Sequence, residues 1–169
     1  MSQSLHIRPV NEADAADLLE IYRPFVEDTA ISFEIEVPSV ADFELRIRSA
    51  AEKWLWLVAE RNDMPIGYAY GSAHRPREAY KYSVETSAYV HRDYHRQGVA
   101  RLLYNKLLIG LTTRGYRNAY AGITLPNEAS MAFHKSVGFE YIGVFPRVGN
   151  KFEQWHDVAW LHRPLSGSE

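Results

Sequence analysis

No cysteine occurs among the 169 residues of the chain. This absence excludes disulfide bonds, cysteine nucleophiles and thiolate metal sites, and it fits a reducing compartment. No segment has the pattern of a signal peptide, and no apolar run is long enough to span a bilayer. We therefore expect a cytoplasmic protein that has no membrane partner and binds no metal.

The chain also lacks an excess of charge of either sign. Its 19 Lys and Arg residues and 21 Asp and Glu residues give a formal net charge of −2. A nucleic-acid partner is disfavoured because there is no basic stripe, so any anion site must be local. The chain is 46% hydrophobic and 24% charged, as is usual for a globular protein. The length predicts one domain over residues 1–169, with an ordered core of about 5–163.

The spacing of apolar residues predicts an α+β fold, a mixed and mostly antiparallel sheet flanked by helices around one core. Pro24 is expected to end or bend the first helix, and residues 27–37 are too irregular for a helix. Residues 54–73 have the pattern of an antiparallel hairpin. Strands are predicted at 5–10, 54–60, 66–73, 84–90, 118–124, 139–144 and 153–162, and helices at 15–22, 39–51, 99–114 and 128–137.

The central feature is a strand, loop and helix over residues 84–108. Backbone N–H groups of residues 96–101 lie where the helix begins and lack partners within it. With the helix dipole behind them they suit a phosphate or pyrophosphate, and Gly98 allows close approach of the backbone. Many helices begin after a glycine turn, so this feature alone leaves phosphate binding open.

Polar side chains near this loop add candidate chemistry. Glu85, on the strand that leads into the loop, is either a general base or a carboxylate paired with an arginine. Arg75 and Arg77 are either solvated surface residues or a bidentate clamp for an anionic acceptor. Phe33 is either a core residue or a pocket wall. His134 either packs on its short helix or acts near a leaving group.

Two segments resemble the GNAT N-acetyltransferases. The run His95-Arg96-Gln97-Gly98-Val99-Ala100 is similar to their acetyl-CoA pyrophosphate loop, which has Arg or Gln, two residues, Gly, one residue, then Gly or Ala. His95 stands where Arg or Gln is usual. Downstream, Asn127, Ser130, His134 and Gly138-Phe139 match the second cofactor segment of the family. The resemblance covers nearly the whole chain and is closest to the phosphinothricin and methionine sulfoximine N-acetyltransferases.

The resemblance implies a GNAT acyl-CoA N-acyltransferase fold, acetyl-CoA as co-substrate and commonly a homodimer. It implies Glu85 as the catalytic carboxylate and His134 near the thioester. It implies acceptor contacts from Phe33, Arg75, Arg77 and Tyr80. The implied acetyl-CoA contacts are Ala88, Tyr89, Val90, Arg96, Gln97, Gly98, Val99, Ala100, Arg101, Asn127 and Ser130.

The implied reaction is acetylation of the α-amine of a small amino acid analogue such as phosphinothricin, methionine sulfoximine or methionine sulfone. Glu85 would take the amine proton, and a backbone N–H near Tyr89, freed by a bulge or splay of its strand, would bind the developing oxyanion. His134 or Tyr104 would supply a proton to the thiolate. The alternatives are an acetyltransferase for another small amine or a polyamine, and a non-catalytic CoA-binding sensor. Glu85 and the two arginines argue against a sensor.

Overall fold

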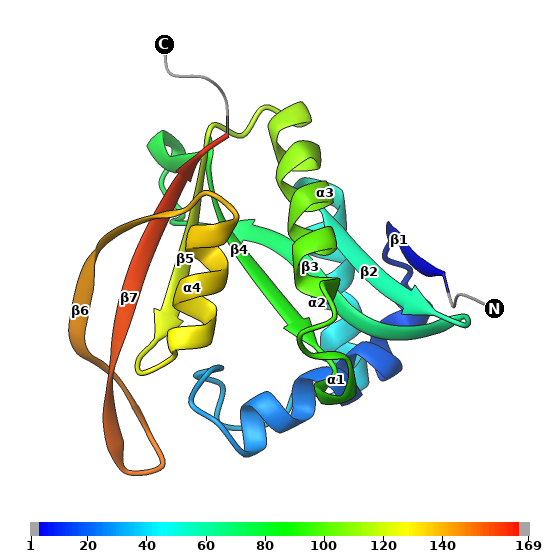
Figure 1. Ribbon diagram of the computed structural model, residues 1–169, viewed down its shortest axis with the longest axis horizontal. Coiled ribbons are helices and arrows are strands. Elements are labelled where there is room, and N and C mark those ends of the chain that lie inside the picture. The colour runs from blue at the N-terminus through cyan, green and yellow to red at the C-terminus, as the bar shows by residue number, and fades with distance from the viewer. Residues whose placement is uncertain (1–3, 166–169) are drawn as a thin grey trace.

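The computed structural model describes residues 4–165, so the outermost residues of the expected domain, 1–3 and 166–169, lie outside the described part. Seven strands form one sheet in the order β1-β2-β3-β4-β5-β7-β6, flanked by four α-helices (Figure 1). The strands are β1 (Leu5–Pro9), β2 (Trp56–Arg61), β3 (Met64–Ala73), β4 (Ser83–Val90), β5 (Asn118–Thr124), β6 (Glu140–Lys151) and β7 (Gln154–Pro164). The helices are α1 (Ala15–Glu27), α2 (Val40–Lys53), α3 (Val99–Thr113) and α4 (Glu128–Ser136).

The order of strands and α-helices is the predicted one, and the mixed-sheet fold is confirmed. Three 3-10 helices were not predicted, namely η1 (Glu12–Asp14), η2 (Glu78–Tyr80) and η3 (Arg92–Tyr94). Within residues 4–165 no helix is long and apolar enough to cross a membrane. The same residues contain no group of three or more His, Asp or Glu side chains that could hold a metal ion.

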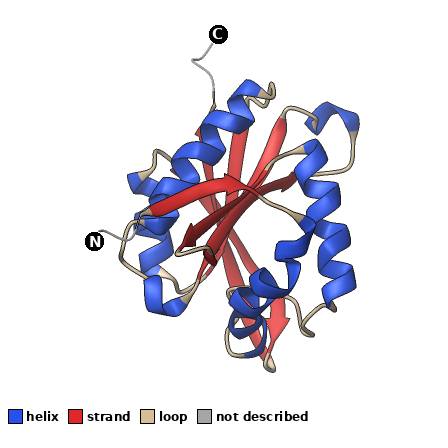
Figure 2. Ribbon diagram, turned by 90° about the vertical axis from the view of Figure 1, so that its right-hand side faces the viewer, coloured by secondary structure: helices blue, strands red, loops and turns tan. Residues whose placement is uncertain are grey.

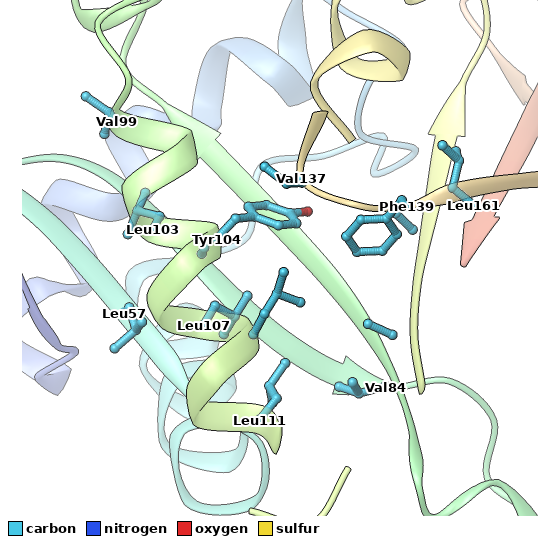
Figure 3. Close-up of a cluster of buried hydrophobic side chains, with 14 of the residues drawn as sticks. Leu57, Val84, Val99, Leu103, Tyr104, Leu107, Leu111, Val137, Phe139 and Leu161 are labelled. Carbon is cyan, nitrogen blue, oxygen red and sulfur yellow. The ribbon is translucent and has the colours of Figure 1, made fainter. Parts of the chain in front are cut away.

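Helices cover both faces of the sheet (Figure 2). Because side chains alternate along a strand, β2 contributes to two cores: Trp56 and Val58 pack with α1 and α2, whereas Leu57 and Ala59 pack with α3. On the α3 face, a row of apolar residues along the helix fills the space above the sheet (Figure 3). This row consists of Val99, Leu103, Leu107 and Leu111.

Pro24 does not end α1, which continues to Glu27. The buried face of the helix extends past the proline to Val26, which is 1% exposed, and this packing holds the last turn in place. Pro24 itself is exposed, and its carbonyl accepts a hydrogen bond from the backbone N–H of Asp28 at 2.9 Å. Burial of the apolar face therefore outweighs the missing N–H of the proline.

β6 is twice as long as expected, because it runs to Lys151 and not to residue 144. Pro146 and Gly149 weaken the strand pattern in the sequence. β6 lies at the edge of the sheet and pairs with β7 through two register shifts. Pro146 falls within the second shift, between the paired residues Phe145 and Gly149, so it removes no ladder bond. Phe152 and Glu153, both at positive φ (54° and 58°), form the turn to β7.

Candidate active site

β4 and β5 separate after three residue pairs. Residues 83–85 of β4 pair with residues 118–120 of β5, whereas β4 stays paired with β3 as far as Val90. Figure 1 shows the two strands together near the top of the view and apart below. The β3–β4 register has no shift, so the opening is a splay and not a bulge. Within residues 4–165, β4 has no strand partner on the β5 side beyond Glu85, and its backbone polar groups there are available to a ligand.

A pocket of about 440 Å³ fills this opening. Its walls come from β4, β5, α3 and the first turns of α4, and Ile31 from the loop between α1 and α2 closes one side. The lining residues are Ile31, Thr86, Ser87, Ala88, Tyr89, Tyr104, Ala121, Gly122, Ile123, Thr124, Asn127, Ser130 and His134. The pocket therefore unites segments that are more than ninety positions apart in the sequence.

Tyr104 and His134 form a buried hydrogen-bonded pair on the α3 face of the opening. The Tyr104 hydroxyl lies 2.9 Å from His134 Nε2, and His134 Nδ1 lies 2.8 Å from the Ser130 carbonyl oxygen. A carbonyl only accepts, so Nδ1 carries the proton and Nε2 accepts the hydroxyl proton of Tyr104. Burial lowers the pKa of His134, which keeps the imidazole neutral, and burial raises the pKa of Tyr104. The hydrogen bond between Tyr104 and His134 therefore contains one proton, which belongs to the Tyr104 hydroxyl.

Glu85 lies on the opposite face of the sheet. Strand alternation turns Val84 and Thr86 toward α3 and the carboxylate of Glu85 toward the side of α1 and α2. Glu85 is also the last β4 residue that pairs with β5, so it marks the point where the opening begins. Burial raises the pKa of Glu85, while the hydrogen bond with His74 and the charge of Arg75 act in the other direction.

The loop before α3 has the geometry expected of an anion site. Arg96 (φ 61°) and Gly98 (φ 79°) are in the left-handed region, and Gly98 is the N-cap residue without a side-chain cap. A Cβ built at Gly98 would meet no atom within 4 Å, so the space above the loop is open to a ligand. The N–H groups of the first turn of α3 point into this space, and the loop therefore fits a pyrophosphate.

Two side chains of this loop hold its shape from within. His95, the residue that departs from the family pattern, donates from Nε2 to the Val90 carbonyl at 2.8 Å. Gln97 donates to the Asp93 carbonyl at 3.0 Å and accepts from Arg61 at 3.0 Å. Contacts to an anion are thereby left to the backbone of the loop and to Arg96 and Arg101.

A groove of about 990 Å³ runs from this loop to α4. Val90, Gly98, Val99, Ala100 and Arg101 line one side, and Ala129 and Phe133 of α4 line the other. Arg101 joins the two sides, because its guanidinium donates to Ser136 Oγ at 2.8 Å. The implied acetyl-CoA residues thus line two hollows: Val90 and the residues at the start of α3 line this groove, and Ala88, Tyr89, Asn127 and Ser130 line the pocket between β4 and β5.

Asn127 caps α4, as the sequence predicts, with Oδ1 accepting from the Ser130 N–H at 3.1 Å. Its amide Nδ2 remains as a donor toward the opening. The Tyr89 ring packs against Tyr22 and Phe25 at centroid distances of 4.9 and 5.0 Å. Tyr89 and Ala88 consequently face the opening with their backbone groups.

Arg75, Arg77 and Tyr80 lie in and next to η2, beyond the end of β3. The Arg75 guanidinium lies 5.9 Å from the centre of the Tyr80 ring, and its charge acts on Glu85. Arg77 is the exposed N-cap residue of η2. The structure therefore brings Arg75 and Tyr80 close to the carboxylate, with Arg77 further out on the same loop.

Phe33 is 38% exposed and does not line the pocket, where Ile31 from the same loop lies instead. Its ring lies so close over Gly149 of β6 that a side chain at that position would collide with it. The ring also lies 6.1 Å from that of His156. Phe33 therefore joins the α1–α2 loop to the β6–β7 hairpin at the rim of the site.

Three residues of the site were missed in the sequence. His74 hydrogen-bonds Glu85, Ile31 closes the pocket, and Lys151 holds the loop that carries Ile31 and Phe33. No local pattern marks Lys151, because Asn150 and Phe152 flank it near the turn of the hairpin, where a lysine is ordinarily solvated. His74 is likewise marked by no local pattern, because its proximity to Glu85 depends on the β3–β4 register.

Comparison with known proteins confirms the resemblance. The acetyltransferase (GNAT) domain matches residues 7–160. A phosphinothricin N-acetyltransferase of Streptomyces coelicolor is 35% identical over 95% of this chain and 96% of its own length. An L-methionine sulfoximine/L-methionine sulfone acetyltransferase of Salmonella typhimurium is 32% identical over 94% of each chain.

Among solved structures, a GNAT superfamily phosphinothricin acetyltransferase from Sinorhizobium meliloti, in complex with acetyl-CoA, is similar with a TM-score of 0.92 and 33% identity. The similarity covers 96% of this chain and 89% of that one. The splayed strands, the loop before α3 and the sequence matches agree, and the chain belongs to the GNAT acetyltransferase family.

Proposed function

We propose that the chain transfers the acetyl group of acetyl-CoA to the α-amine of a small amino acid analogue of the phosphinothricin, methionine sulfoximine or methionine sulfone type. The observation that carries the proposal is the position of Glu85 at the start of the opening between β4 and β5. There a half-buried carboxylate on one face meets a pocket that is lined by Tyr104 and His134 on the other. The names of the relatives support this class of acceptor.

Acetyl-CoA supplies the thioester whose acetyl group is transferred. The backbone N–H groups of residues 96–101 bind its pyrophosphate, and Arg96 and Arg101 add positive charge. The free backbone edge of β4 from residue 86 to 90 and the Asn127 amide bind the peptide-like arm in the opening. Gln97 and His95 act by holding the loop in shape.

Glu85 removes the proton that keeps the acceptor nitrogen from attacking. An α-ammonium group is mostly protonated near neutral pH, whereas the raised pKa of Glu85 brings this carboxylate closer to the working range of a base. The backbone N–H groups of β4 that β5 leaves unpaired stabilise the negative charge that develops on the acyl oxygen.

Tyr104 donates the proton that the departing sulfur requires. Its hydroxyl lines the pocket and holds the one proton between the two rings, whereas neutral His134 accepts it and sets its direction. The raised pKa of Tyr104 ensures that the phenol is protonated at neutral pH. The proton that the acylated nitrogen loses restores the phenol, and neutral His134 again accepts its hydrogen bond and fixes its direction.

The acceptor lies on the Glu85 side of the sheet. Arg75 binds its anionic group as a bidentate fork, Arg77 extends the positive charge of the loop, and Tyr80 covers the aliphatic portion. Ile31 and Phe33 form the apolar rim. An aminoglycoside or a polyamine is disfavoured, because two arginines would repel a second positive charge.

A thiol-release assay tests the proposal. Wild-type chain and the Glu85→Gln variant are given acetyl-CoA and a panel of amino acids with their sulfone, sulfoximine and phosphinate analogues. We expect turnover for the anionic analogues in the wild type and its loss in the variant. Turnover with polyamines alone would support the alternative acceptor class. Binding of acetyl-CoA without turnover of any amine would support the sensor.

We further propose that the active form is a homodimer, built on the edge strand β6. Its open side carries an unusually apolar surface, and such a strand edge is rarely left uncovered. The exposed apolar residues of the β6–β7 hairpin are Tyr141, Ile142, Val144, Phe145, Val148, Phe152 and Trp155. Light scattering should give the mass of two chains, and Ile142→Lys should reduce it to one. Ile109→Lys is the matched control, because Ile109 is 69% exposed on α3.

A further inference from the structure

We propose that His74 is the positioning residue of Glu85: its Nδ1–H fixes one carboxylate oxygen and leaves the other free to meet the amine. The inference rests on the proposed role of Glu85 as the base. It concerns a residue on the loop after β3 whose imidazole reaches the carboxylate across the β3–β4 pair.

The position of His74 follows from the register of the two strands. Ser72 lies opposite Glu85, and Ala73 lies opposite Val84, so His74 leaves β3 just beyond the carboxylate. His74 Nδ1 lies 3.0 Å from Glu85 Oε2, with the side chains 17% and 29% exposed. A carboxylate only accepts, so Nδ1 is the donor, and the contact is a charge-assisted hydrogen bond.

Aromatic contacts fix the direction of the His74 ring. Its plane stacks on Tyr120 at 4.9 Å and 22°. Tyr120 stacks in turn on His162 at 4.9 Å, and His162 Nε2 lies 2.8 Å from Asn118 Oδ1. The edge of His74 meets the rings of Tyr80 and Trp160 at 5.6 and 6.1 Å. The imidazole is therefore held by β5 and β7, the strands on the far side of the opening from Glu85.

The second ring nitrogen is directed elsewhere. Among the described residues His74 Nε2 has no hydrogen-bond partner. Trp56 Nε1, Arg61 Nε and Trp160 Nε1 are fully buried without a partner, whereas His74 Nε2 is not fully buried. Nε2 consequently reaches solvent. The Nδ1–H therefore faces the carboxylate, while Nε2 faces away from it.

Within residues 4–165, few other ionisable groups surround the pair. Arg75 acts on Glu85 from the same loop, and Tyr70 lies within electrostatic range on β3. Tyr80, Tyr120 and His162 complete the set around the imidazole. Arg75 favours the ionised carboxylate but is not hydrogen-bonded to it in the described residues, so His74 is the group that fixes its direction.

Two variants of His74 separate positioning from packing. His74→Phe keeps the stacked ring and removes the donor, whereas His74→Asn keeps a donor at the place of Nδ1 and removes most of the ring. The measurement is kcat/KM for the acceptor across pH 5.5–9.5, with acetyl-CoA saturating. For His74→Phe we expect the acid limb to move to higher pH, with a loss of about tenfold or more at low pH that shrinks as pH rises. His74→Asn should keep the acid limb of the wild type.

A profile of His74→Phe that overlies the wild type would overturn the inference, and so would equal, pH-independent losses in both variants. A double-mutant cycle adds a second readout: in a Glu85→Gln background, His74→Phe should cause no further change. Failure of the proposed function is distinguishable from failure of this inference. Full activity of Glu85→Gln would show that Glu85 is not the base and would overturn the proposed function. Loss of activity in Glu85→Gln together with an unaltered pH profile of His74→Phe would overturn only the role of His74.

Discussion

The ammonium nitrogen of Lys151 lies 2.7 Å from the carbonyl oxygen of Ser32 and 2.7 Å from that of Val26. Val26 belongs to the last turn of α1, and Ser32 lies in the loop that carries Ile31 and Phe33. Lys151 is 3% exposed, and burial lowers its pKa. One positive charge at the end of β6 thus stabilises the negative end of a helix and holds the loop that follows it.

Replacing Lys151 by Met should leave these two carbonyls without a donor. We expect the free energy of unfolding to fall by about 1–3 kcal/mol, since buried polar groups that lose their partner destabilise a fold by this amount. The KM for the acceptor should rise more than the KM for acetyl-CoA, because no residue of this loop lines the groove beside the loop before α3. Urea unfolding and steady-state kinetics measure both. Lys106→Met, an exposed lysine on α3, is the control, and equal effects of the two changes would contradict the assignment.

Replacing Glu85 by Gln should lower kcat by about 10²- to 10⁴-fold, the usual contribution of a general base. The affinity for acetyl-CoA should stay nearly unchanged, because Glu85 faces the other side of the sheet. The defect should shrink at high pH, where the amine loses its proton to water. A loss of constant size across the pH range would assign Glu85 a structural role.

The same variant should be more stable than the wild type at neutral pH. Burial raises the pKa of Glu85 in the folded protein, so folding favours the protonated carboxyl. Its stabilising contribution is complete below the unfolded-state pKa and is lost as pH rises through the folded-state pKa. A neutral glutamine lacks this dependence. Thermal unfolding should therefore show a higher Tm for Glu85→Gln at pH 8 and a smaller difference at pH 4. The reverse order would mean that the His74 bond outweighs burial.

Gly98→Val should weaken acetyl-CoA binding severely. Valine at φ 79° is strained, and its side chain would occupy the open space above the loop. Gly115→Val is a matched control, because Gly115 ends the same helix at φ 95° and also has open space around it. Both variants should lose stability, but calorimetry should show lost affinity only for Gly98→Val. Unchanged affinity in folded Gly98→Val would remove the loop from the cofactor site.

Arg75→Ala should raise the KM for anionic acceptors by about one to two decades, which is the loss of roughly 1.5–3 kcal/mol for a charge-assisted bond. Arg77→Ala should have a smaller effect, because only Arg75 acts on Glu85. Lysine at position 75 should restore part of the loss, as it keeps the charge without the fork. A neutral amine acceptor serves as the control and should be little affected. Equal losses with both kinds of acceptor would show that the arginines shape the loop.

Much of the fold follows from local patterns in the sequence. The helices and strands were predictable because their apolar faces repeat at the period of each element, and because Gly98, Gly115 and Asn127 mark helix ends by their geometry. The second half of β6 was not predictable, because Pro146 and Gly149 weaken its strand pattern and its stability comes from pairing with β7. Tertiary pairing there overrides local preference.

The candidate site divides in the same way. The loop before α3 and the cap of α4 are local structures, so their residues could be chosen from sequence. His74 and Lys151 act through long-range contacts: the first depends on the β3–β4 register, and the second joins β6 to carbonyls more than a hundred positions earlier. A single sequence contains no measure of such distances, and a histidine in a polar loop is ordinarily solvated.

β4 and β5 form three residue pairs, and this short paired segment, the seam, joins the two parts of the sheet. Val84 and Ala119 are both fully buried at this seam, and Glu85, the proposed base, is the last residue of β4 that pairs across it. A change in side-chain volume beneath the seam would therefore alter the angle between the two parts of the sheet and shift the Glu85 carboxylate with it. The width of the opening and the place of the proposed base are thereby linked through one short stretch of β4, so a variant with a wider opening would also need a new placement of its carboxylate.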